Sequence, residues 1–231
     1  MKFAVTVFPG TNCEHDIAYA LGNLGATVDL VWHRETSLAG YDGVVLPGGF
    51  AHGDYLRTGA IAARSPIMAE VAVMATAGAP VVGICNGFQI LCEAGLLPGA
   101  LVANRDLRFI CRPVHVRVEH SRSALTSAAT AGSVLQIPLN SYEGNWVADG
   151  ADLAGIEERG HVILRYCNAA GNVDDRTSPN GSTRSVAGLC NEAGNVAGFM
   201  PHPERAAADA PGSKDGDLLL RSMLTSVPAV R

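Results

Sequence analysis

Residues 80–89 read Pro80-Val81-Val82-Gly83-Ile84-Cys85-Asn86-Gly87-Phe88-Gln89. At this point a short apolar run typical of a buried strand turns, through a Gly-x-Cys-x-Gly motif, into a helical pattern. This layout is that of a nucleophile elbow with cysteine in place of serine, and it predicts an α/β fold. Glycines are expected on both sides of Cys85 because a Cβ atom in so sharp a turn would clash.

Cys85 has two interpretations. A single cysteine after a buried strand is most often a small core residue. The two bracketing glycines favour a nucleophile whose sulfur lies at the N-terminus of a helix, where the backbone N–H of Asn86 can point at a developing oxyanion. The catalytic interpretation then requires a base elsewhere in the chain.

A candidate base lies near the other end of the chain, in Met200-Pro201-His202-Pro203-Glu204-Arg205. Because a residue before proline is disfavoured in helices, we expect His202 to be extended between its two prolines. In an extended segment, residues two apart share a face, so Glu204 can accept a hydrogen bond from the imidazole. Cys85, His202 and Glu204 are therefore predicted to form a catalytic triad. Taken alone, His202 could equally be an ordinary loop histidine.

A third segment, Leu46-Pro47-Gly48-Gly49-Phe50, follows the apolar run at 42–46. Without side chains at its two glycines, the backbone from Gly48 to Phe50 can approach a ligand closely. A Gly-Gly pair by itself indicates no more than a turn. In an α/β protein, however, this loop falls at the carboxyl edge of the sheet, where such folds bind ligands.

Strand and helix patterns alternate along the first half of the chain. Strands are expected at 2–8, 27–32, 42–46 and 81–84, and helices at 13–24, 66–76 and 86–93. This alternation predicts a doubly wound, mostly parallel sheet, like that of flavodoxin. The second half predicts an antiparallel excursion with strands at 112–119, 134–138, 161–167 and 186–199, the last broken at 191–194, and then a helix at 215–224. With no repeat or linker visible, residues 1–231 are expected to form a single domain.

Composition narrows the class of protein. The chain of 231 residues is 48% hydrophobic with a formal charge of −5, which gives no basic surface for nucleic acid. No apolar run has the length of a membrane span. The six cysteines contain no Cys-x-x-Cys pair, so neither a disulfide scaffold nor a metal site is expected, and the reducing cytoplasm is the predicted compartment.

With these motifs in place, the chain resembles class I glutamine amidotransferases, and within that class the family of glutaminase subunits of phosphoribosylformylglycinamidine synthases. The resemblance covers essentially the whole chain, and its most specific parts are Cys-Asn-Gly-Phe-Gln at 85–89 and Gly-Asp-Tyr-Leu-Arg at 53–57. Further matching stretches are Phe8-Pro9-Gly10-Thr11-Asn12-Cys13, residues 93–100, Phe109-Ile110-Cys111-Arg112, Glu143-Gly144-Asn145 and Pro179-Asn180-Gly181-Ser182.

The resemblance implies a reaction and an arrangement of subunits. The chain would hydrolyse glutamine to glutamate and ammonia through a thioester on Cys85. It would pass the ammonia to a synthase subunit, which uses ATP and Mg²⁺ to convert formylglycinamide ribonucleotide to formylglycinamidine ribonucleotide. Relatives of this kind also work with a small bridging subunit. The chain itself has neither a P-loop nor a Gly-x-Gly-x-x-Gly turn after its first strand, so no bound cofactor is expected here.

The resemblance also implies roles for residues around the triad. The backbone amides of Gly49 and Asn86 would form the oxyanion hole, and Gly48, Phe50 and Gln89 would bind substrate. An exposed helical glutamine is the alternative for Gln89. Tyr55 and Arg57 would contact either substrate or partner, or simply be solvated.

One departure from the family pattern stands out. Members carry His-Gly before the Glu-Gly-Asn stretch, whereas this chain has Ser141-Tyr142, so no role of that histidine carries over. Two other functions also fit parts of the sequence. They are the glutaminase subunit of a different amidotransferase and a stand-alone hydrolase with a cysteine elbow, although the Pro-His-Pro-Glu arrangement argues against the latter.

Overall fold

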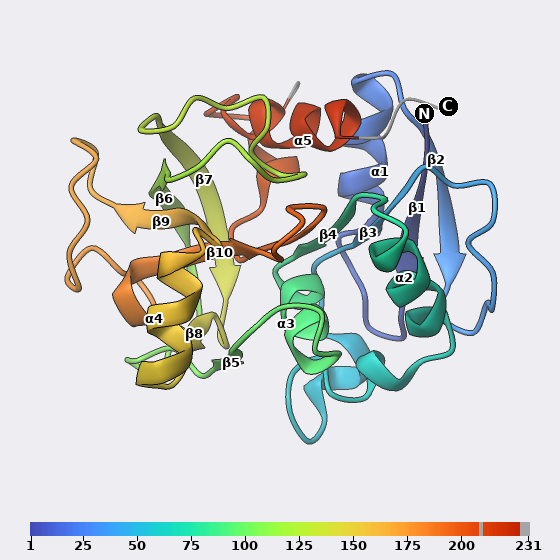
Figure 1. Ribbon diagram of the computed structural model, residues 1–231, viewed down its shortest axis with the longest axis horizontal. Helices are drawn as coiled ribbons and strands as arrows, with labels where there is room; N and C mark the ends of the chain where they lie inside the picture. The colour runs from blue at the N-terminus through green and yellow to red at the C-terminus, as the bar shows by residue number, and fades with distance from the viewer. Residues whose placement is uncertain (208–209, 227–231) are drawn as a thin grey trace.

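The computed structural model describes residues 1–207 and 210–226, in which nine strands form one sheet (Figure 1). The strand order is β2-β1-β3-β4-β11-β10-β9-β6-β7. The strands are β1 (Lys2–Val7), β2 (Thr27–Trp32), β3 (Gly43–Leu46), β4 (Val81–Ile84), β6 (Ile110–Val118), β7 (Val134–Ser141), β9 (Val162–Cys167), β10 (Val186–Cys190) and β11 (Val196–Phe199).

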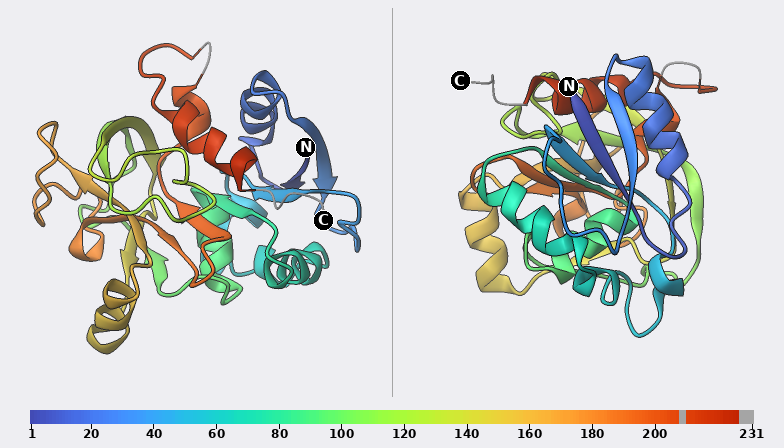
Figure 2. Two further views of the ribbon diagram at one scale, coloured as in Figure 1. Left: turned by 45° about the horizontal axis from the view of Figure 1, so that its top comes forward. Right: turned by 90° about the vertical axis from the view of Figure 1, so that its right-hand side faces the viewer.

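The first five strands in this order are parallel to one another, as predicted. Parallel strands must be linked by crossovers, and here α1 (Glu14–Asn23) lies between β1 and β2 and α2 (Ile67–Thr76) between β3 and β4. Helix α3 (Asn86–Glu93) follows β4 and leads into the second half of the chain. Figure 2 shows α1 and the last helix, α5 (Gly216–Thr225), on one side of the sheet, and α2 and α3 on the other. The predicted fold class, a doubly wound sheet with an antiparallel second part, is confirmed.

The antiparallel part extends the same sheet rather than forming a separate one. Strands β10, β9, β6 and β7 pair antiparallel in that order. The sequence placed 196–199 in this antiparallel part, but β11 is antiparallel only to β10 and runs parallel to β4 on its other side. That strand joins the two halves in the middle of the sheet, and its four residues are all buried.

Three elements were not predicted. Helix α4 (Gly150–Glu158) begins at Asp149, whose side chain accepts a hydrogen bond from the Asp152 N–H. Its one buried residue is Ile156, so the helix has little apolar periodicity to reveal it. Strands β5 (Ala100–Val102) and β8 (Asn145–Val147) form a separate two-stranded sheet of three residues each, too short to leave a pattern. In the described part of the chain, no helix combines the length and apolar character needed to cross a membrane.

The elbow lies at the end of β4 and depends on its two glycines. A Cβ atom at Gly83 would lie 2.5 Å from the carbonyl oxygen of Gly87, and one at Gly87 would collide with the carbonyl oxygen of Leu46. Neither carbonyl can move away, because each belongs to buried backbone of α3 or β3. Helix α3 therefore begins against β3 and β4 only if both positions lack a side chain.

We expect Gly87→Ala to destabilise the fold by at least about 2 kcal/mol, because the added methyl group overlaps a backbone oxygen that cannot be displaced cheaply. The matched control is Gly22→Ala in α1, where a Cβ atom meets nothing within 4 Å. There the change should stabilise the protein by about 0.5–1 kcal/mol through helix propensity. Urea unfolding of both variants measures the difference, and equal stabilities would show that the close approach of α3 to Leu46 is dispensable.

Candidate active site

Cys85 is the residue between β4 and α3, and its backbone is strained. It has φ 51° and ψ −106°, a conformation that costs a residue with a side chain about 1–3 kcal/mol. The turn is held by the Cys85 N–H, which donates to the carbonyl oxygen of Phe199 at 2.8 Å. The Cys85 carbonyl in turn accepts from the N–H groups of Phe88 and Gln89 at 3.0 and 3.2 Å. The predicted elbow is therefore present, with its sulfur directed toward β7, where the thiol donates to the Asn140 carbonyl at 3.6 Å.

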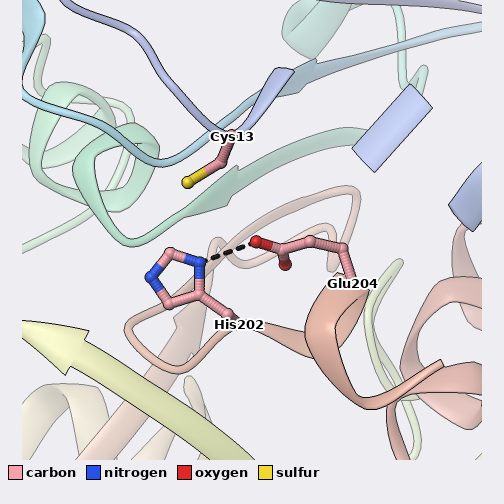
Figure 3. Close-up of side chains that lie close together, drawn as sticks. All are labelled: Cys13, His202 and Glu204. Atoms are coloured by element: carbon pink, nitrogen blue, oxygen red, sulfur yellow. Dashed lines mark hydrogen bonds and ion pairs between the residues drawn. The ribbon is translucent and has the colours of Figure 1, made fainter. Parts of the chain in front are cut away.

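His202 and Glu204 form a buried pair. The Nδ1 atom of His202 lies 2.6 Å from Oε1 of Glu204, and the two residues are only 2% and 6% exposed (Figure 3). The backbone of His202 is extended as predicted, and its backbone N–H donates to the carbonyl of Pro138 at 2.7 Å. The local conformation beyond it differs from the prediction, since Pro203–Ala206 is a 3-10 turn that begins at a proline. The predicted contact forms despite this turn.

The ring of His202 favours its protonated state. Burial by itself lowers the pKa of His202, but the carboxylate of Glu204 and then the sulfur of Cys85 favour the imidazolium, and the net effect raises the pKa well above its usual value. The Nε2 atom is buried and has no hydrogen-bond partner among the described residues. His202 and Cys85 line the same pocket, and the thiols of Cys13 and Cys85 both contribute to the raised pKa of the imidazole, so the ring lies close to both sulfur atoms.

Cys13 lies next to His202, which the sequence did not predict (Figure 3). A Cβ atom placed at Gly48 would be 2.7 Å from Cε1 of His202 and 3.0 Å from Sγ of Cys13, so these two side chains meet over that glycine. The ligand atoms of Cys13, His202 and Glu204 all lie within 4.8 Å of one another. Nδ1 of His202 is already bonded to Glu204, so a metal ion at this cluster would have to replace that bond.

The loop after β3 approaches the elbow as predicted, but Gly48, Gly49 and Phe50 differ in whether they reach the pocket and in whether their backbone groups are already hydrogen-bonded. Gly49, with φ 149°, and Phe50 line the pocket. The Phe50 N–H is not available to a ligand, because it donates to the Gly10 carbonyl at 2.9 Å. Gly48 lies behind the pocket wall, where its carbonyl accepts from the Cys13 N–H at 3.2 Å.

Gln89 is buried rather than exposed, which rules out the alternative of a solvated helical side chain. Its Oε1 accepts from Nδ2 of Asn86 at 2.8 Å, and its Nε2 donates to the Glu143 carbonyl at 2.6 Å. Asn86 in turn accepts from the N–H of Ala51 at 3.0 Å. The bonds to Ala51 and Glu143 tie the elbow helix to the loops on both sides of the pocket, and the bond between Asn86 and Gln89 links these two anchors within the helix.

The pocket has a volume of about 470 Å³ and brings together five of the predicted site residues. They are Gly49, Phe50, Cys85, Gln89 and His202. Asp54, Thr58 and Glu143 also line it. Asp54 and Glu143 belong to stretches that carry the family resemblance, but the sequence predicted no role for any of the three. Burial, and then the charge of Glu143, raise the pKa of Asp54 to about 6. A buried carboxylate beside another carboxylate is typical of a binding or catalytic site.

Tyr55 and Arg57 lie on the same loop as Asp54 but point elsewhere. Tyr55 is 70% exposed, and the guanidinium of Arg57 pairs with Glu93 at the end of α3. Neither residue lines the pocket. A role in substrate binding is therefore less suited to them than a role at an interface.

Comparison with known proteins gives one consistent family. Residues 1–214 match the CobB/CobQ-like glutamine amidotransferase domain. The chain is 50% identical over 231 residues to the phosphoribosylformylglycinamidine synthase subunit PurQ of Gloeobacter violaceus, covering 100% of both chains. It is 52% identical over 218 residues to that of Bradyrhizobium diazoefficiens, covering 94% of each.

Solved structures show the same likeness. The structure of PurLQS from Thermotoga maritima contains a chain with 40% identity and a TM-score of 0.84, covering 97% of each chain. A glutamine amidotransferase from Thermotoga maritima, at 14% identity and a TM-score of 0.57 over 88% of this chain and 76% of its own, shares the fold.

Asp54 generates a prediction about stability and pH. Because its folded pKa is raised from 3.8 to about 6, the folded chain binds this proton more tightly than the unfolded chain, and the fold loses stability as pH rises through this interval. We expect Asp54→Asn to stabilise the protein at about pH 8 by about 1 kcal/mol, a value reduced because the carboxyl is partly solvated. The gain should vanish at about pH 4, where wild-type Asp54 is protonated.

Thermal unfolding across this pH range measures the effect. The matched control is Asp106→Asn, whose side chain is 71% exposed and should have little influence at any pH. A stabilisation by Asp54→Asn that persists unchanged at about pH 4 would contradict the assignment, since it could not come from the charge.

Proposed function

Because the chain belongs to the CobB/CobQ-like glutamine amidotransferase family, we propose that it is the glutaminase subunit of a phosphoribosylformylglycinamidine synthase. One observation carries the proposal: a cysteine on a strained elbow and a buried His202–Glu204 pair line or border one pocket, in a chain that matches PurQ subunits over its whole length. The reaction is the hydrolysis of glutamine to glutamate and ammonia.

The first half of the reaction forms a thioester. The Cys85 thiol gives its proton to Nε2 of His202, and the resulting thiolate attacks the side-chain amide carbon of glutamine, so that the carbonyl electrons move onto oxygen. His202 then gives its Nε2 proton to the nitrogen as the carbon–nitrogen bond breaks and ammonia leaves. The raised pKa of His202 suits this step, because the imidazolium is the proton donor. Glu204 keeps the ring oriented through Nδ1.

The second half releases glutamate. Neutral His202 removes a proton from a water molecule, which attacks the thioester carbon, and the sulfur leaves as a thiolate that His202 can protonate or pair with. In both halves the oxyanion would be held by the N–H groups of Gly49 and Asn86. The loss of one such donor costs an enzyme of this type about 3 kcal/mol of transition-state stabilisation.

The substrate would lie between the loop after β3 and the elbow helix. The proposed binding residues are Gly48, Phe50 and Gln89, and each contributes in a different way. Phe50 and Gln89 line the pocket, whereas Gly48 acts from behind by leaving room for His202 and Cys13. Gln89 acts by holding the walls of the pocket, because both ends of its side chain are bonded to protein.

We propose that the ammonia passes to a synthase subunit, with a small bridging subunit in the same complex, as the PurLQS relative supports. ATP and Mg²⁺ would be bound by the synthase subunit rather than by this chain, and the complex would work in the cytoplasm. Ammonia is mostly protonated in neutral water, and protonated ammonia is no nucleophile. A partner that covers the pocket would therefore protect the product.

Exposed apolar side chains at the pocket mouth suit such a partner. Phe50, Phe109 and Tyr142 line the pocket and are nonetheless 45%, 51% and 42% exposed. On the loop that continues from Phe50, Tyr55 and Leu56 are 70% and 82% exposed. Apolar side chains gathered around an opening are typical of a surface that another protein covers.

The triad predicts non-additive losses of activity. Cys85→Ala and His202→Ala should each lower the glutaminase rate by at least about a thousandfold, and the double variant should lose little more, because both residues serve one proton-transfer sequence. Ammonia release by each purified variant measures this. Cys167→Ala is the control, since this thiol of β9 lies outside the triad and does not line the pocket. Losses that add in log rate, or inactivation by Cys167→Ala, would be incompatible with the proposed roles.

The partner should stimulate the glutaminase. The loop after Phe50 presents the exposed side chains of Tyr55 and Leu56, and a partner that binds them more tightly in the active form of the pocket shifts the population toward that form. Each tenfold stimulation needs only about 1.4 kcal/mol. We expect the glutamine hydrolysis rate to rise at least about tenfold when the synthase subunit is added together with its nucleotides.

Leu56→Asp should reduce this stimulation without changing the rate of the isolated chain, because an exposed left-handed position accepts aspartate. The control is Val73→Asp, a 61% exposed residue of α2 that does not line the pocket. Equal rates with and without the partner would refute the coupling and leave the glutaminase function in place.

A further inference from the structure

Two carboxylates on the pocket wall have no ion-pair partner among the described residues. Asp54, on the loop after Phe50, and Glu143, just beyond β7, both line the pocket, and the charge of Glu143 acts on Asp54. Arg57 does not line the pocket and pairs with Glu93. Arg205 lines the pocket, but its guanidinium contacts Asp16 and the sulfur of Cys13 rather than either of these carboxylates. The Oδ1 atom of Asp54 is buried and has no hydrogen-bond partner in the described part of the chain.

A third polar group on this wall is also unsatisfied. Thr58 is 4% exposed, and its hydroxyl lines the pocket without a hydrogen-bond partner among the described residues. A buried hydroxyl without a partner costs free energy unless a ligand or water satisfies it. Thr58 is four residues beyond Asp54. One segment therefore offers a polar ligand both a hydrogen-bond donor, the hydroxyl of Thr58, and an acceptor, the carboxylate of Asp54.

The backbone holds both carboxylates in place. Asp54 has φ 54°, a left-handed conformation that persists only where the surroundings enforce it. The loop is fixed before Asp54 by the bond from the Ala51 N–H to Asn86, and Glu143 is fixed by its carbonyl, which accepts from Gln89. The elbow helix therefore positions the two carboxylates relative to Cys85.

Building on the proposed glutaminase function, we propose that Asp54 and Glu143 bind the α-ammonium group of glutamine. When the side-chain amide of glutamine reaches Cys85, the other end of the molecule still carries an ammonium and a carboxylate. An ammonium has a positive charge and three donors, which match two carboxylates that otherwise repel each other. The hydroxyl of Thr58 is a suitable donor to the substrate carboxylate. The wall thus selects a free amino acid over other amides.

The test compares two substrates. Glutaramate has the same amide and carboxylate as glutamine but lacks the α-ammonium group. In the complex with the synthase subunit, Asp54→Asn should raise KM for glutamine about ten- to hundredfold, the range expected for one charge-assisted hydrogen bond, with little change in kcat. KM for glutaramate should stay the same or fall. Thr58→Val should instead raise KM for both substrates alike, since both carry the carboxylate.

Controls separate the possible outcomes. Asp106→Asn, an exposed carboxylate outside the pocket, should leave both KM values unchanged. Equal losses on glutamine and glutaramate in Asp54→Asn would overturn the proposal, because they would reveal only a structural role for Asp54, and so would the absence of any loss. If the wild-type complex releases no ammonia from glutamine, the proposed function itself fails. If the wild-type complex releases ammonia but Asp54→Asn changes KM for glutamine and glutaramate alike, only the proposed ammonium site is refuted.

Discussion

The site depends on one constraint, which is that Cys85 adopts a left-handed conformation between a buried strand and a buried helix. A strained residue keeps its conformation only if its neighbours leave no alternative. Here β4 is buried between β3 and β11, and α3 is packed so tightly that Gly83 and Gly87 cannot carry side chains. The strain is therefore maintained by the packing of the sheet, and the orientation of the sulfur follows from it.

The parallel pairing of β4 with β11 explains how residues far apart in sequence meet. Ile84 pairs with Phe199, and the backbone N–H of the next residue, Cys85, donates a hydrogen bond to the Phe199 carbonyl. Because parallel strands end at the same edge of the sheet, the elbow after β4 and the His202 turn after β11 emerge side by side. The antiparallel strand β7 also contributes to the site. Its Pro138 carbonyl accepts from the backbone N–H of His202, and its Asn140 carbonyl accepts from the thiol of Cys85.

Much of this could be predicted from the sequence where the signal is local. The bounds of β4 and α3 follow from an apolar run and a glycine motif, and the His202–Glu204 contact follows from spacing alone. What could not be predicted arises from contacts between distant segments. The burial of Gln89 depends on the carbonyl of Glu143, and the place of Cys13 depends on how the loop after β1 crosses Gly48. Neither leaves a periodic pattern.

The pocket keeps several polar atoms unsatisfied, and this is the opposite of what stability alone would favour. Nε2 of His202, Oδ1 of Asp54 and the hydroxyl of Thr58 are all buried without partners in the described residues, although folded proteins satisfy most such atoms. Each of these three residues lines the pocket that Cys85 enters. The fold can tolerate a few such atoms, because the large sheet supplies the stability that they remove. For Asp54 and Thr58 this location argues that a polar ligand is the partner, whereas the imidazole of His202 also interacts with the thiols of Cys85 and Cys13.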